Sequence, residues 1–212
     1  MCIRDRAIFV GIITGTGVGI LNGLLVARAR VSGVVVTLGT ASILQGVIIG
    51  KSGGQSVVNG IPNSFINFGT SNVIGIPEIL APVIVVAILT YYLLAQTPLG
   101  RFMHMVGINR SAARLVGVSP GRVVFASFVA SGTISGIAGV LEVAHSGSAD
   151  PNAGGTYTLP ALAAAFLSAA AIKPGSYNVG GVLTAITFLA VINGGLNPVS
   201  YTHLTLPTIL RV

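Results

Sequence analysis

The chain has 212 residues, of which 52% are hydrophobic and only 7% charged, and its mean hydropathy is +0.90. A soluble domain carries roughly 25% charged residues, so the composition excludes a soluble protein and predicts an integral membrane protein. In a soluble chain, the formal net charge of +7 would favour the binding of nucleic acid. Here the basic residues stand beside apolar runs, which argues against nucleic acid as a partner and favours anionic membrane lipid.

Both ends of the chain differ from its centre. Residues 1–6 are rich in charge, and residues 199–212 form a polar tail with several Thr and a Pro. Both segments resemble translated sequencing-adapter sequence, so we expect them to be artefactual. The membrane domain is then residues 7–198, and the natural protein is expected to be longer at both ends. The alternative of a genuine terminus and tail stays open.

Apolar runs long enough to cross the roughly 30 Å hydrocarbon core follow in chain order. They cover residues 7–27, 31–50, 79–95, 123–141 and 179–196. The apolar run 160–172 is too short for a full crossing and suits a re-entrant helix buried in protein. Segments 51–77 and 142–158 are polar, and the first is expected to hold short structured pieces. The predicted fold is all-α, a polytopic membrane helix bundle with about five full spans plus one short or re-entrant helix.

Glycines recur at helical spacing in the first and fourth spans. The first span has a glycine at every fourth position: Gly11, Gly15, Gly19 and Gly23. A similar face of the fourth span holds Gly132 and Gly136. Because a missing side chain lets another helix approach closely, we predict that both faces are helix-packing surfaces.

The basic residues indicate the orientation of the chain. Arg28 and Arg30 follow the first span, and the third span is followed by a segment, 100–122, with four arginines and no acidic residue. If the spans alternate, both segments fall on one side, which the positive-inside tendency makes cytoplasmic. We therefore predict a multi-pass membrane protein whose 100–122 loop faces the cytoplasm.

The centre of this basic loop has the signals of a short helix. Asn109 is a good N-cap, residues 110–116 favour helix, Gly117 can adopt the left-handed conformation that ends a helix, and Pro120 prevents continuation. So short a helix needs a surface to pack against. Two interpretations stay open on these residues alone: an interfacial helix with arginines on lipid phosphates, or a helix seated in a cytoplasmic partner.

The sequence GINRSAARLVGVSPGR, residues 107–122, resembles the cytoplasmic signature of the ribose/xylose/galactose-type permeases of bacterial ABC importers. The matching positions are Gly107, Asn109, Ala112, Ala113, Gly117 and Val118. Further resemblance lies in segments 19–31, 37–40, 97–101, 141–154, 173–181 and 193–197, and it extends over nearly all of residues 7–198. Residues 167–175 depart from the glycine-rich stretch usual in the family. Family members are also longer, so this chain is expected to lack the first few and last one or two membrane helices.

The resemblance implies a permease subunit that forms a homodimer in the bacterial inner membrane and imports a monosaccharide. Two cytoplasmic ABC ATPase subunits would dock on this helix, and a periplasmic solute-binding protein would deliver the sugar. The docking residues implied are Asn109, Arg110, Ala112, Ala113, Arg114 and Gly117. No G-x-x-x-x-G-K-[ST] loop is present in the sequence. We therefore expect no cofactor in this chain, with ATP and Mg²⁺ bound by the partner subunit.

Uncharged polar residues within the spans are candidates for the substrate pathway, because they can hydrogen-bond sugar hydroxyls. They are Asn22, Thr37, Thr40, Gln45, Ser131 and Asn193. For each of them, hydrogen bonding to a neighbouring helix is at least an equal interpretation.

Two other classes of function compete with an importer. An ion-coupled secondary transporter of small polar solutes would need an ionisable group near mid-membrane. Glu142 is the candidate, but it lies at a predicted outer boundary, where a solvated surface with His145 and Asp150 is the better interpretation. A membrane-embedded enzyme would need a nucleophile–base pair or a metal set, and one cysteine with three histidines offers neither pattern.

Overall fold

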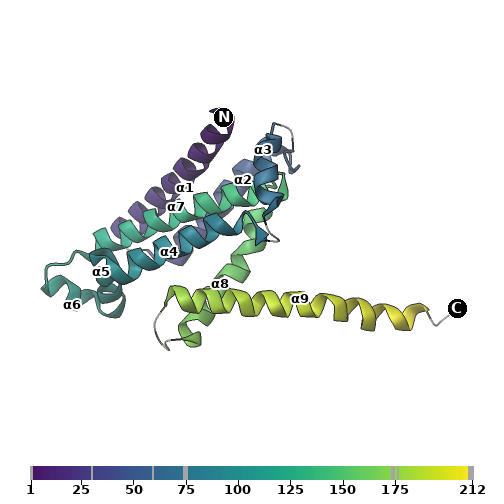
Figure 1. The fold of residues 1–212 in the computed structure, drawn as a ribbon. Coiled ribbons are helices and arrows are strands. Elements are labelled where there is room, and N and C mark those ends of the chain that lie inside the picture. The colour runs from purple at the N-terminus through teal and green to yellow at the C-terminus, as the bar shows by residue number, and fades with distance from the viewer. Residues whose placement is uncertain are drawn as a thin grey trace. The chain divides into compact units, whose positions relative to one another are not determined.

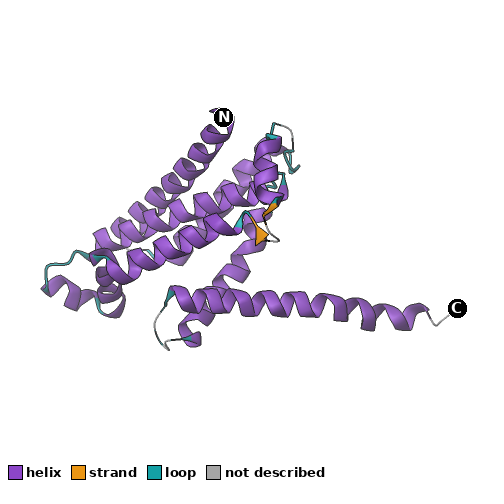
Figure 2. Ribbon diagram, in the orientation of Figure 1, coloured by secondary structure: helices purple, strands orange, loops and turns teal. Residues whose placement is uncertain are grey.

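The computed structural model describes residues 2–29, 31–58, 60–73, 76–172, 175 and 177–209. Nearly all of this backbone is helical, and a small hairpin supplies the strands (Figure 2). The chain forms two compact units, Met1–Ala153 and Gly154–Val212, which are described separately. The all-α class predicted from the sequence is confirmed.

The first unit is built on long apolar helices: α1 (Cys2–Ala29), α2 (Gly33–Ser52), α4 (Leu80–Gln96) and α7 (Pro120–Ser146) (Figure 1). Within the described residues, Arg6–Ala29, Gly33–Ser52 and Pro120–Ser146 are long and apolar enough to cross a membrane. The apolar part of α4 makes a fourth crossing if it is taken together with the helix that follows it. These helices match the first four predicted spans.

Helices α1 and α7 are antiparallel and form the main packing pair of this unit. A Cβ added to Gly15 would lie 2.5 Å from the carbonyl oxygen of Gly132, and one added to Gly19 would lie 2.5 Å from that of Phe128. On Gly136 it would lie 2.7 Å from the carbonyl oxygen of Gly11. Since real Cβ atoms cannot approach so closely, only glycine permits this backbone-to-backbone contact. The two predicted glycine faces therefore meet each other.

The polar segment after α2 folds against the far end of α7. It contains α3 (Asn63–Thr70) and the two-residue strands β1 (Asn72–Val73) and β2 (Ile76–Pro77), which pair antiparallel. Helix α3 packs on α7, with Gly69 against the backbone of Ala144 and Phe65 buried. Val57 and Ala149 exchange backbone hydrogen bonds of 3.0 and 2.9 Å. The short structured pieces expected here are thus present.

The basic segment 100–122 is mostly helical, so its prediction as a loop around one short helix was wrong. Helix α5 (Pro98–Ile108) follows α4 after a bend of 69°, and α6 (Arg110–Leu115) follows α5. The chain can turn so sharply because Gly100 lies against the Leu94 backbone, where no side chain fits. Pro120 is the first residue of α7 rather than a simple stop, because its missing N–H costs nothing in a first turn.

The second unit contains α8 (Ala153–Ala171) and α9 (Val179–Ile209). Helix α8 begins seven residues before the predicted run at 160, and α7 continues to Ser146, so the predicted polar segment 142–158 is largely helical at both ends. The helix accommodates Pro160 in its interior. Gly181 packs on the Ser168 backbone, and the Asn178 carboxamide accepts from the Gly181 amide at 2.6 Å. The apolar part of α9, Val179–Gly195, is shorter than a full span.

Candidate functional site

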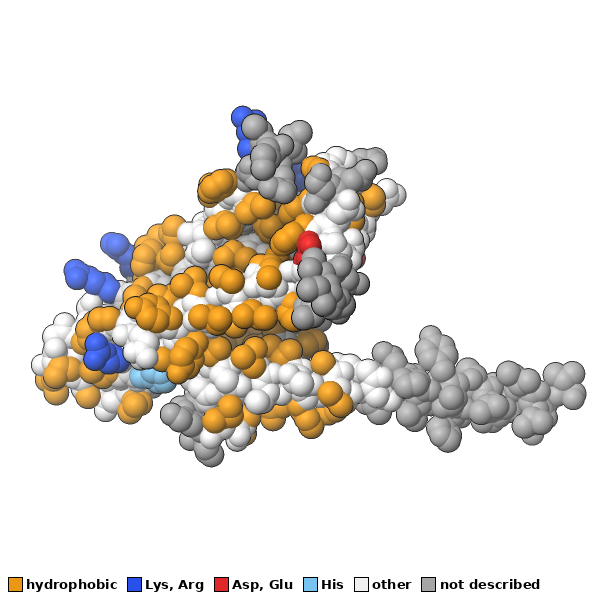
Figure 3. Space-filling view, viewed as in Figure 1, with side chains coloured by type: hydrophobic (Ala, Val, Ile, Leu, Met, Phe, Trp, Pro, Cys, Tyr) orange, Lys and Arg blue, Asp and Glu red, His pale blue; other side chains and the backbone are white. Residues whose placement is uncertain are grey.

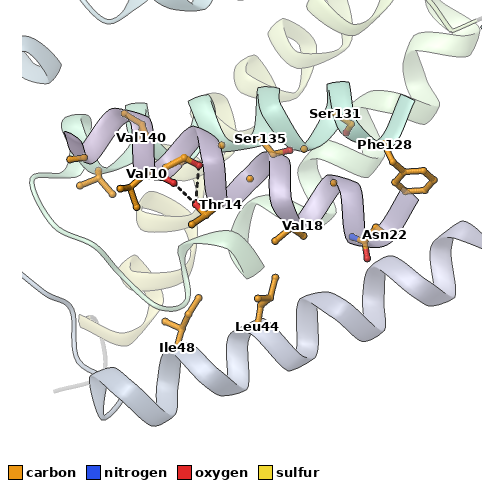
Figure 4. Close-up of a pocket in the computed structure, with 18 of the residues that line it drawn as sticks. Val10, Thr14, Val18, Asn22, Leu44, Ile48, Phe128, Ser131, Ser135 and Val140 are labelled. Carbon is orange, nitrogen blue, oxygen red and sulfur yellow. Dashed lines mark hydrogen bonds between the residues drawn. The ribbon is translucent and has the colours of Figure 1, made fainter. Parts of the chain in front are cut away.

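A cavity of about 820 Å³ lies between α1, α2 and α7. Its glycines belong to the α1–α7 packing seam, and its larger side chains are mostly apolar (Figure 4). Phe65 of α3 contributes to its lining near Val140 and Val143 of α7. The cavity is therefore bounded by elements that the sequence separates by more than a hundred positions.

The cavity brings together half of the predicted pathway residues. Asn22, Thr37 and Ser131 line it. The Thr40 hydroxyl donates to Asn22 Oδ1 at 2.7 Å, and Gln45 Nε2 donates to Asn152 Oδ1 at 3.5 Å. Asn193 lies in α9 of the second unit, and its side chain is exposed.

Sequence reasoning missed two polar residues of this lining, Thr14 and Ser135. Both could have been found from helical spacing. Ser135 follows Ser131 by one turn, and Thr14 precedes Gly15 on the glycine face of α1. The Thr14 hydroxyl is engaged by its own helix, at 2.9 Å from the carbonyl oxygens of Val10 and Gly11. In the part of the chain that the structure describes, the hydroxyls of Ser131 and Ser135 make no hydrogen bond.

The chemistry of the cavity is neutral. None of its described lining residues carries a charge, and its polar groups are one carboxamide and four hydroxyls, on Asn22, Thr14, Thr37, Ser131 and Ser135. Such groups can exchange hydrogen bonds with an uncharged polar solute. A charged group entering the cavity would lose its hydration without finding an ion partner, which costs far more than the loss of one hydrogen bond.

The second candidate region is α6, and the predicted cap of this helix is confirmed. The Asn109 side chain accepts hydrogen bonds from the backbone amides of Ser111 (2.9 Å) and Ala112 (3.1 Å). Gly117 has φ +80°, the left-handed conformation expected after a helix. The Val118 amide then donates to the Ala113 carbonyl at 3.0 Å. The end of the helix is thus closed locally as well.

Helix α6 is attached by one small residue and exposes larger ones. Ala113 is fully buried, whereas Leu115 and the C-cap residue Val116 are 90% and 69% exposed, and Ile108 at the end of α5 is 86% exposed. Among the other predicted docking residues, Arg110, Ala112, Arg114 and Gly117 are exposed. Of these exposed apolar residues, sequence reasoning missed Ile108, because it precedes the residues that carry the helix signals.

Positive charge surrounds this apolar tip. Figure 3 shows basic side chains at the end of the unit where α5 and α6 lie, and others near the N-terminus at the start of α1. Arg101 and Arg122, from α5 and α7, are exposed like those of α6. The acidic residues Glu78 and Glu142 lie at the end of the unit away from α6. Glu78 precedes the start of α4, and Glu142 is in the last turns of α7. This asymmetry agrees with a cytoplasmic α6.

Apolar helices of spanning length, a neutral cavity among them and a basic helix displayed at one end define a multi-pass membrane protein. The chain belongs to the family described as branched-chain amino acid transport system / permease component, which matches residues 6–209. It is thus a multi-pass protein of the bacterial inner membrane, as the sequence predicted.

Several curated relatives are permeases of import systems. The chain is 30% identical to the ribose import permease RbsC of Haemophilus influenzae, over 89% of this chain and 59% of the relative. It is 31% identical to the D-allose transport permease AlsC of Escherichia coli, over 90% and 58%. It is 30% identical to the autoinducer 2 import permease LsrD of Yersinia enterocolitica, over 90% and 59%. The chain spans about three fifths of the length of these relatives, and no solved structure matches it.

Proposed function

We propose that this chain is the permease subunit of a bacterial ABC importer and moves a neutral, hydroxyl-bearing solute of monosaccharide size inward. A separate ATPase subunit, which would hold ATP and Mg²⁺, docks on α6, and a periplasmic solute-binding protein supplies the solute. The permease works as a homodimer in lipid and carries out no chemical reaction itself. The observation that carries the proposal is the neutral cavity combined with the displayed apolar tip of α6.

The tip of α6 supports docking of a protein. Leaving a Leu side chain in water forfeits about 1.5–3 kcal/mol of burial free energy, and Leu115 is 90% exposed. A cluster of exposed apolar residues ringed by polar ones is typical of a protein contact. Ala113 and the Asn109 cap anchor the helix, which leaves its apolar side chains free to contact a partner.

The neutrality of the cavity supports the class of solute. The family description includes branched-chain amino acids, which are zwitterions. An amino acid would bring two charges into the cavity, and none of the described lining residues has a charged side chain to pair with them. Burial of these unpaired charges would be costly. A sugar would instead meet the free hydroxyls of Ser131 and Ser135 and the carboxamide of Asn22. The relatives named for ribose, D-allose and autoinducer 2 agree with this choice.

Docking is tested by the substitution Leu115→Asn, with Ser111→Asn on the same exposed helix as the matched control. The binding partner is the ABC ATPase subunit of the same importer, and its affinity is measured by titration in detergent micelles. Loss of one central apolar anchor costs about 2 kcal/mol, or roughly 30-fold in affinity. The control should bind like the unchanged protein. Equal affinity for Leu115→Asn would show that the ATPase does not use this tip.

Transport is tested in liposomes that contain the permease, the ATPase subunit and the binding protein. Radiolabelled D-ribose, D-allose and L-leucine serve as probes, each with and without ATP. We expect ATP-dependent uptake of one of the sugars and none of L-leucine. Uptake driven by a proton gradient without ATP would instead support an ion-coupled secondary transporter.

A further inference from the structure

One end of the cavity is closed by contacts between α1, α2 and α7. The Phe128 side chain of α7 lies against both other helices there: a Cβ added to Gly23 would be 3.1 Å from Phe128 Cβ, and one added to Gly33 would be 3.3 Å from Phe128 Cζ. Figure 4 shows Phe128 and Asn22 at the same end of the cavity, with Ile48 and Val140 at the other. This closed end is near Arg28, on the side expected to be cytoplasmic.

A side-chain hydrogen bond completes this closure. Thr40 of α2 donates to Asn22 Oδ1 of α1 at 2.7 Å, and in the described residues this is the side-chain hydrogen bond that links these two helices. Asn22 is 8% exposed and also lines the cavity. The carboxamide therefore stands between the cavity and the contact that keeps α2 on α1.

The Thr40 hydroxyl has a second acceptor within its own helix, the Val36 carbonyl oxygen at 2.9 Å. A hydroxyl has one proton, so it can donate to Asn22 or to Val36 and remain satisfied in either case. Breaking the link therefore leaves only the Asn22 carboxamide without its partner. A buried polar group without a partner is costly, and an incoming hydroxyl would remove that cost.

The opposite wall of the cavity cannot open in the same way. Helices α1 and α7 touch through glycine backbones along the seam from Gly11 to Gly23, and Thr16 and Thr133 add a contact of 3.0 Å between their hydroxyls. Separating these helices would lose close packing over several turns. Helix α2 is exposed along residues 41–50 and has far less contact with α1. The movable wall is therefore α2.

We propose that the Asn22–Thr40 hydrogen bond is a latch on the cytoplasmic end of the cavity, released when a hydroxyl of a neutral solute takes the place of Thr40 on Asn22. Thr40 then donates to Val36, and α2 separates from Phe128. This inference rests on the proposed function, because it assigns the solute to the same cavity. It adds a specific recognition group, the Asn22 carboxamide, and couples binding of the solute to opening of the inner end.

The latch is tested by measuring the distance between α1 and α2 in liposomes. Spin labels are attached to Leu24→Cys and Leu38→Cys in a Cys2→Ser background. The two leucines are 52% and 54% exposed. Each lies two positions from Asn22 or Thr40, so its label points away from the hydrogen bond, on the opposite face of the helix. Pulsed electron paramagnetic resonance gives the distance distribution. Thr40→Val removes the hydroxyl at constant shape, and Thr40→Ser keeps it as the matched control. Asn22→Leu removes the acceptor and serves as a second variant if Thr40→Val does not fold.

The latch predicts a single short distance for the unchanged protein and for Thr40→Ser. Thr40→Val or Asn22→Leu should increase the separated population about fivefold, the shift that corresponds to one net hydrogen bond. D-ribose or D-allose should produce the same separation in the unchanged protein, and L-leucine should not. Unchanged distances in both variants would overturn the latch, and so would variants that separate while neither sugar moves the unchanged protein. These distances involve neither ATPase nor uptake, so the outcome is independent of the transport assay.

Discussion

Gly15 of α1 and Gly132 of α7 pack backbone against backbone, and a Cβ on either glycine would lie 2.5 Å from the other's carbonyl oxygen. Both residues were predicted to lie on packing faces, and the structure shows that the two faces are complementary. This contact forms the rigid wall of the cavity. It also makes the stability of the unit sensitive to a single methyl group at these positions.

Gly15→Ala should destabilise the protein, because the added methyl forces α1 and α7 apart. Overpacking of this kind costs about 1–3 kcal/mol. Gly17→Ala on the same helix is the matched control, since nothing lies within 4 Å of its added Cβ and Ala favours helix by about 1 kcal/mol. Unfolding by sodium dodecyl sulfate in micelles provides the measurement. Equal stability of the two variants would contradict the packing described here.

Asn109→Ala should loosen α6 without unfolding the unit. Its carboxamide accepts from the Ser111 and Ala112 amides, and losing such a cap costs about 0.5–2 kcal/mol. Hydrogen exchange at residues 110–115 should accelerate accordingly, and binding of the ATPase subunit should weaken. Asn109→Ser retains an acceptor and should restore most of the protection. If both variants exchange alike, the cap does not stabilise the helix.

Gly69→Ala should lift α3 from the end of α7, since the new Cβ would overlap the Ala144 backbone. Phe65, buried on the same helix and part of the cavity lining, should become accessible. Hydrogen exchange over residues 65–70 should rise roughly tenfold for each 1.4 kcal/mol lost. Gly46→Ala in α2, where the added Cβ meets nothing within 4 Å, should leave this exchange unchanged.

The orientation predicts opposite labelling of two exposed positions, Gln55 and Ser111. In a Cys2→Ser background, Ser111→Cys should react with a membrane-impermeant maleimide only when the cytoplasmic face is open to the reagent. Gln55→Cys should react in intact spheroplasts. Labelling of both positions from the same side would mean that the chain between them crosses the membrane an even number of times. That result would refute the single crossing assigned to α4.

The sequence by itself determined the features that depend on neighbours within a turn or two. Composition required a membrane, glycines at every fourth position formed a face, and the Asn109–Gly117 pattern produced a capped helix at the predicted place. Such signals are local because capping and helix-face spacing involve residues three or four apart. Segment 98–108 was misjudged because its mixture of arginine and apolar residues has no clear membrane signature, yet it is helical once α6 and α7 pack beside it.

Only the tertiary structure decided which faces meet and which polar groups pair. Asn22 and Thr40 are both ordinary polar residues within apolar spans, and nothing in their spacing of eighteen positions indicates a shared hydrogen bond. Likewise, the glycine face of α1 could have met any small-residue surface, and its partner is α7 because the close fit is available along several turns. Long-range pairing depends on the complementary shape of two whole surfaces. That property belongs to the folded chain and is absent from any short stretch of it.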